Sequence, residues 1–189
     1  MHDPLANFLG AAKDGLINYH YEDAVRLAGH SCPTVASAFL MTRNALAALY
    51  GGDLPVRGEI RIDLREARDA GVTGVIASIA TLVTGATADS GFRGLGGQFN
   101  RRDKLFFAQA LSIGELRFTR LDTGASVEAS ADLSHVQGDP RTSELMSLCL
   151  SGQATPQQQQ TFRSAWQDRV RRLLLEHADD PQVIRVSPA

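Results

Sequence analysis

The residues most able to do chemistry stand together at Gly29-His30-Ser31-Cys32-Pro33, which places an imidazole, a thiol and a proline within five positions. An apolar stretch over residues 34–50 follows. Proline is favoured at the first position of a helix, because the N–H that it lacks would be unpaired there. The spacing therefore predicts Cys32 as the N-cap of a long helix. A thiol at the positive end of a helix dipole ionises more readily, and the thiolate is the form that binds metals and attacks electrophiles.

His30 and Cys32 together offer a borderline nitrogen donor and a soft sulfur donor, which is half of a metal site. Structural zinc takes four protein donors and catalytic zinc commonly takes three. The other donors must therefore come from elsewhere in the chain, from another copy of it or from a ligand. His20, one helix length upstream, is the nearest candidate for a third ligand, although a surface histidine on a helix would give the same pattern. The expected ion is a divalent transition metal, with zinc first.

Two other uses of the same residues stay open. Haem or another cofactor can take His30 or Cys32 as an axial ligand. Alternatively, a Cys32 thiolate can act as the nucleophile of an enzyme if His20 or His135 serves as its base. The sequence has no Ser-His-Asp elbow, HExxH or CxxC pattern, so no catalytic signature accompanies the metal candidates. The glycine-rich run over residues 91–97 matches neither of the common phosphate-binding patterns.

Composition limits the class of protein. The 189 residues suffice for one domain, and 43% of them are hydrophobic, which is ample for a packed core. A formal net charge of -2 and short basic runs give no reason to expect nucleic acid as a partner. The start of the chain does not look like a secretion signal, and no apolar stretch is long enough to span a membrane. We therefore expect a cytoplasmic protein, with no membrane partner and with both cysteines reduced.

The rest of the chain alternates between helical and strand periodicity. Helices are predicted over 3–28 (as one or two), 34–50, 72–83, 140–151 and 155–174, and strands over 58–64, 104–110, 115–121, 126–132 and 182–186. This order predicts an α+β fold, a small and mostly antiparallel sheet packed with helices, and a C-terminal helical hairpin. We expect a single domain over 1–189. The helix over 34–50 is apolar on most sides, so we expect it to be buried centrally or against a partner chain.

The Gly29–Pro33 motif and its helix resemble the metal-binding segment of the FmdE-like family, which takes its name from formylmethanofuran dehydrogenase. That segment reads roughly His-Gly-His-x-Cys-Pro-Gly. Thr84-Gly85-Ala86-Thr87 resembles the family's Thr-Gly-Cys-Thr, and a strand over residues 103–107 follows in the same order. The run over 151–156 resembles the segment that opens the family's last long helix. The resemblance covers residues 15–186. It implies a metal-binding homodimer with the metal near a cleft, and a small-molecule ligand as a further candidate partner.

The chain departs from the family's pattern at several metal-binding positions. Ala28 stands where the family has its first histidine, and Ala86 stands where it has a cysteine. The cysteine-rich zinc ribbon of some members is missing. Of the family's metal-binding residues, only His30 and Cys32 carry over. The resemblance therefore implies a metal site that is weakened, changed in selectivity or replaced by a site for another cofactor such as haem.

Overall fold

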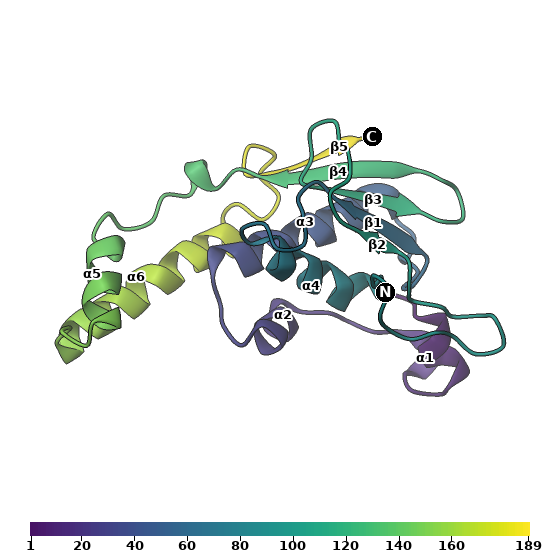
Figure 1. The fold of residues 1–189 in the computed structure, drawn as a ribbon, viewed down its shortest axis with the longest axis horizontal. Coiled ribbons are helices and arrows are strands. Elements are labelled where there is room, and N and C mark those ends of the chain that lie inside the picture. The colour runs from purple at the N-terminus through teal and green to yellow at the C-terminus, as the bar shows by residue number, and fades with distance from the viewer.

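The computed structural model describes residues 1–189 as a sheet, a layer of helices against one of its faces and a projecting helical hairpin (Figure 1). The helices are α1 (Pro4–Phe8), α2 (Tyr21–Ala28), α3 (Pro33–Tyr50), α4 (Thr73–Thr84), α5 (Thr142–Leu150) and α6 (Pro156–Leu175). The strands are β1 (Ile60–Leu64), β2 (Leu105–Phe106), β3 (Leu116–Arg120), β4 (Ser126–Ala131) and β5 (Ile184–Pro188). Two short 3-10 turns are η1 (Lys13–Gly15) and η2 (Leu133–His135). The predicted α+β fold is confirmed.

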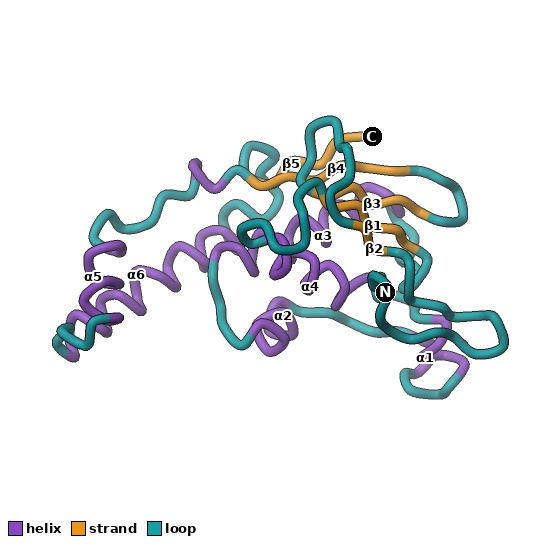
Figure 2. Tube along the Cα trace, viewed as in Figure 1, coloured by secondary structure: helices purple, strands orange, loops and turns teal.

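The five strands form one sheet in the order β2-β1-β3-β4-β5 (Figure 2). Every neighbouring pair is antiparallel except β1 with β2, which is parallel. Side chains alternate along β1, so that Ile60 and Ile62 are fully buried against the helices while Arg61 lies on the opposite face. An antiparallel sheet can leave one face toward water, and here α3 and α4 cover only the other face.

Helix α3 is the centre of the core. It packs on α4, α6 and strands β3 to β5, and Leu40 and Met41 are each 1% exposed. Gly51, with a φ of 58°, ends it. A helix that is apolar on most sides must be buried, and the single chain supplies that burial without a partner. Of the two positions expected for this helix, the structure shows the central one.

The C-terminal hairpin consists of α5 and α6 and projects away from the sheet (Figure 1). Thr155 and Gln158 form a capping box at the start of α6. Only the C-terminal part of α6 packs on the body of the protein, because Val170 and Leu173 are buried there and α6 contacts α3. Even α6, at 20 residues, is too polar to cross a lipid bilayer, and no other helix meets the requirement for such a span.

Two segments differ in detail from the prediction. The region over 3–28 holds α1 and α2 as separate helices, because Gly10 and Gly15 adopt positive φ angles of 67° between them. The strand predicted over 104–110 is reduced to β2. Ala108, with a φ of 54°, turns the chain there, and its amide donates to the carbonyl of Glu66 outside the ladder.

Candidate metal site and adjoining groove

Cys32 lies where the sequence predicts it, at the N-cap of α3. Its backbone is extended (φ -149°, ψ 166°), and its Sγ accepts the amide hydrogen of Val35 at 3.4 Å. Pro33 takes the first helical position, where no N–H is needed. The residue is only 9% exposed. The sulfur therefore stands at the positive end of α3 but is largely shielded from solvent.

His30 has the hydrogen bond that favours metal binding through its other ring nitrogen. Its Nδ1 lies 3.0 Å from the carbonyl oxygen of Ala28. Because a carbonyl oxygen only accepts, Nδ1 carries the proton, and Nε2 of the neutral ring keeps a free lone pair. Histidines that bind metals usually donate their second ring N–H in this way. His30 is exposed, one residue beyond the left-handed Gly29 that ends α2.

Ser31, the residue between the two candidate ligands, is held from two helices. Its carbonyl oxygen accepts from Nε1 of Trp166 at 3.0 Å and from Nε2 of Gln167 at 3.1 Å, both on α6. Its hydroxyl forms a 2.9 Å hydrogen bond with that of Tyr21 on α2. Burial raises the pKa of Tyr21, so its phenol stays protonated at neutral pH. The loop between α2 and α3 is thus tied by hydrogen bonds to both α2 and α6.

His20 lies away from this pair. It is the N-cap of α2, whereas His30 follows the other end of the same helix, so the eight residues of α2, about 12 Å of helix, lie between them. His20 lines a different pocket of about 330 Å³ beside α3, together with Phe39 and Arg43. His135, the other candidate base, is exposed in η2 and lies 3.7 Å from Asp132. Nowhere in the chain do three or more His, Cys, Asp or Glu side chains gather as a metal cluster.

A groove runs between α2 and α4 beside His30, and we call it the α2–α4 groove. It consists of two pockets, of about 260 Å³ and 530 Å³, that share Leu27, Gly74 and Ser78. His30 lines the smaller pocket, and Cys32 is not among its lining residues. The larger pocket continues along α4 to Leu82, roughly 12 Å from Gly74 at the rise of an α-helix.

The other wall of the α2–α4 groove comes from two segments far away in the sequence. Thr87 follows α4, and Leu105 and Phe107 belong to β2 and the residue after it. These residues lie in the second and third segments that carry the family resemblance. The structure therefore brings His30 and both downstream segments to one groove. Sequence reasoning missed Leu27 and Gly74, since nothing in their local pattern marks them as lining residues.

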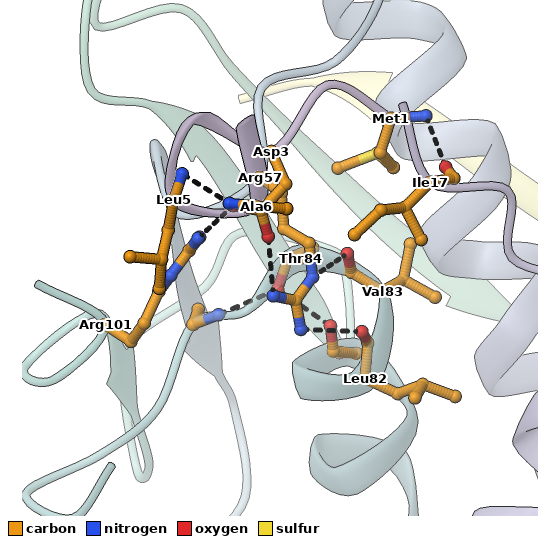
Figure 3. A network of polar contacts seen from close by, with 12 residues as sticks. Met1, Asp3, Leu5, Ala6, Ile17, Arg57, Leu82, Val83, Thr84 and Arg101 are labelled. Atoms are coloured by element: carbon orange, nitrogen blue, oxygen red, sulfur yellow. Dashed lines mark hydrogen bonds and ion pairs between the residues drawn. The ribbon is translucent and has the colours of Figure 1, made fainter. Parts of the chain in front are cut away.

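A buried ion network closes the end of α4 (Figure 3). Asp3 accepts from Nη1 of Arg57 at 3.0 Å and from Nη2 of Arg101 at 2.7 Å. Arg57 also donates to the carbonyl oxygens of Leu82 and Val83 in the last turn of α4. Burial alone would raise the pKa of Asp3, but hydrogen bonds from its neighbours, including Arg57, outweigh burial and lower it. One carboxylate thus faces two guanidinium groups, which leaves one positive charge in excess.

The most strongly perturbed carboxyl group, Glu128 on β4, lies on the opposite face of the sheet. Its oxygens accept from the amides of Ser112, Ile113 and Gly114 at 3.0, 2.7 and 2.8 Å, and from Arg117 at 2.7 Å. Burial alone would raise the pKa of Glu128, but these donors outweigh it and lower the pKa to about 2. Every oxygen is occupied, so this carboxylate fixes the loop before β3 and has no free position for a metal.

Neither a protein-family model nor a curated protein matches this chain. What the chain does must therefore be inferred from its own residues.

Proposed function

We propose that the chain is a metal-binding protein that resembles the FmdE-like family of formylmethanofuran dehydrogenase, with His30 and Cys32 as its ligands for a divalent transition metal such as zinc. The hydrogen bond between Nδ1 of His30 and the carbonyl of Ala28 carries the proposal, because it leaves Nε2 as the free donor. The placement of Cys32 at the N-cap of α3 adds a soft sulfur donor at the start of that helix.

Two protein donors leave coordination positions open. Because no group of three donor side chains gathers anywhere in the chain, water, a ligand in the α2–α4 groove or a donor from a second copy would have to complete the coordination shell. Such a site holds its ion less tightly than a four-donor structural zinc site, and it can exchange ligands. The proposed site would therefore leave coordination positions of the metal open to ligands, unlike a structural zinc site.

The proposal includes a homodimer, as the resemblance implies, and a cytoplasmic location, as expected from the sequence. The α5–α6 hairpin supports a second copy as partner, since it projects from the body and leaves Leu150 82% exposed at its tip. Light scattering should give twice the chain mass of 20.4 kDa, and Leu150→Glu should shift the protein toward the monomer. A monomeric wild type would reject the dimer and leave the metal proposal standing.

The metal site is tested on protein purified without an affinity tag. With zinc supplied in excess, equilibrium dialysis followed by elemental analysis should find one bound metal ion per chain in the wild type and a large loss of it in both His30→Ala and Cys32→Ser. His135→Ala, which removes an exposed histidine elsewhere, is the matched control and should keep the metal. Unchanged metal content in both site variants would reject the proposal.

The two alternative uses of these residues give different results in the same preparation. Haem would colour the protein and give a strong near-ultraviolet band, which His30→Ala or Cys32→Ser should remove. A Cys32 nucleophile would be alkylated at neutral pH faster than free cysteine. A colourless protein whose Cys32 reacts no faster than free cysteine would leave metal binding as the remaining function.

A further inference from the structure

The α2–α4 groove has an apolar base that no part of the chain covers. Leu27 lies at the junction of its two pockets and is 53% exposed. Ala77, Leu82 and Leu105 extend the apolar surface along the larger pocket. At about 530 Å³, that pocket alone is within the range of small-molecule sites.

Arg68 is a cation in the wall of the larger pocket, and its ion pair with another residue is weak. The guanidinium of Arg68 lies over the ring of Phe107, 5.0 Å from its centroid, which fixes it beside the apolar base. Its one ion pair is with Asp89 at 3.8 Å, and the two side chains are 65% and 84% exposed. An exposed pair at that distance contributes little, so an incoming anion can replace Asp89.

The same pocket carries a second, fixed positive charge. Arg57 lines it, and its three nitrogens already donate to Asp3, Leu82 and Val83. Arg57 therefore contributes a positive charge to the pocket, while each of its nitrogens is already engaged in a hydrogen bond within the protein. Because Arg101 shares the single carboxylate of Asp3, this wall retains an excess of positive charge even after the pairing (Figure 3).

From this combination we infer that the α2–α4 groove binds a small organic anion, with an apolar or aromatic body over Leu27 and Ala77 and its anionic group on Arg68. A carboxylate and a phosphate ester share this chemistry. The inference does not depend on metal at His30, since the anion-binding residues lie in the larger pocket. It assigns a class of ligand to the larger pocket of the groove, whereas the metal proposal concerns His30, which lines the smaller pocket.

Anilinonaphthalene sulfonate, a fluorescent aromatic anion, is the probe, and phenylnaphthylamine is its uncharged counterpart. The wild type should bind the sulfonate saturably at one site, with or without a metal chelator. Arg68→Gln should weaken the sulfonate about tenfold and change the affinity for phenylnaphthylamine less than about twofold, because only the charge-assisted contact is lost. Competition by a carboxylate such as benzoate and by phenyl phosphate then distinguishes the two anion types.

Gly74→Leu is the blocking variant. A Cβ at this helical position would meet only the carbonyl of Arg68, at 3.6 Å, so a larger side chain fills the groove without displacing the backbone. It should abolish binding of both probes and keep the melting temperature. Ala47→Leu, which narrows the separate pocket beside His20, is the control and should leave binding unchanged.

Three outcomes overturn the inference. The first is sulfonate binding that does not saturate in the wild type. The second is unchanged binding in Gly74→Leu. The third is loss of binding in Ala47→Leu instead, which would place the probe beside α3. Metal content plays no part in these readouts, so a failed metal site and a failed anion site remain distinguishable.

Discussion

Two buried carboxylates in different parts of the structure have similar chemistry but different surroundings. Glu128 and Asp3 are both buried carboxylates with arginine partners, and both have lowered pKa values. The carboxylate of Glu128 accepts hydrogen bonds from three backbone amides and from Arg117, so it holds the loop before β3 in place. Asp3 is shared between two arginines and leaves positive charge beside a groove. The number and kind of hydrogen-bond donors, rather than the residue type, therefore distinguish a carboxylate with a structural role from one that affects the charge of a groove.

The lowered pKa of Glu128 makes stability depend on acid. Its ordinary value of 4.5 applies in the unfolded chain, and about 2 applies in the folded one. The unfolded state therefore takes up its proton first, and the contribution to stability is complete above about pH 4.5 and lost as the pH falls toward 2. Glu128→Gln should lower the free energy of unfolding at pH 7 by roughly 3 kcal/mol. It should also flatten the loss of stability as the pH falls from about 4.5 toward 2.

Urea unfolding followed at several pH values measures both effects. Glu144→Gln, an exposed carboxyl in the first turn of α5, is the matched control and should follow the wild type at every pH. A variant at Glu128 with the wild-type acid dependence would show that its protonation is not linked to folding.

At the scale of elements, α4 is held at its C-terminus by the segment before β1, whose Arg57 is itself paired with Asp3. Arg57 donates to the last carbonyls of α4, and the amide of Gly58 donates to the carbonyl of Thr84. Cations and amide donors suit the negative end of a helix. Gly58 has a φ of 88°, and a Cβ there would lie 1.9 Å from Nη1 of Arg101. The absence of a side chain at Gly58 thus allows the ion network to reach α4.

Gly58→Ala should destabilise the protein by roughly 2–4 kcal/mol, because it combines a strained φ with a clash against a buried guanidinium. Gly52→Ala is the control, since a Cβ at Gly52 meets nothing within 4 Å and no positive φ is required there. Thermal and urea unfolding of both variants give the comparison. Equal stability of the two would mean that Arg101 moves aside without cost.

Periodicity predicted most elements, because their burial follows a local pattern. The apolar alternation of Ile60 and Ile62 identified β1, and the Cys32-Pro33 cap identified the start of α3. Local pattern did not predict the parallel pairing of β2, whose two residues depend on β1 for their partners. Nor did it reveal the α2–α4 groove or the donor set of Glu128, because these arise where residues distant in sequence meet. The hydrogen bond between His30 and the carbonyl of Ala28 could not be predicted either, since it depends on the rotamer of the histidine side chain.

At the scale of the whole molecule, stability is distributed unevenly between the body and the hairpin. α3 has buried residues along its whole length, whereas α5 has one buried residue, Leu145, and packs mainly on α6. Segments with few buried apolar contacts open at lower free energy than the core. The free end of the hairpin is therefore expected to open without unfolding the sheet.

Hydrogen exchange should separate these two regions. In Leu150→Glu, the variant expected to be monomeric, amides of α5 and of the first half of α6 should exchange faster than those of α3 by at least roughly two orders of magnitude. Amides near Val170 and Leu173 should exchange slowly, because that end of α6 is packed on α3. Slower exchange of α5 in the wild type than in Leu150→Glu would support a second copy on the hairpin, whereas α5 protected as strongly as α3 in Leu150→Glu would contradict the prediction.

The position of β5 has a consequence for how the protein is made. β4 forms hydrogen bonds with β3 on one side and with β5 on the other, yet residues 132–183 are synthesised between β4 and β5. At translation rates of about 5–20 residues per second, β4 leaves the ribosome with one open edge for roughly 3–10 s. During that interval the nascent chain carries an unpaired strand that neighbouring nascent chains can capture. Slow synthesis of the hairpin therefore lengthens the period in which aggregation competes with completion of the sheet.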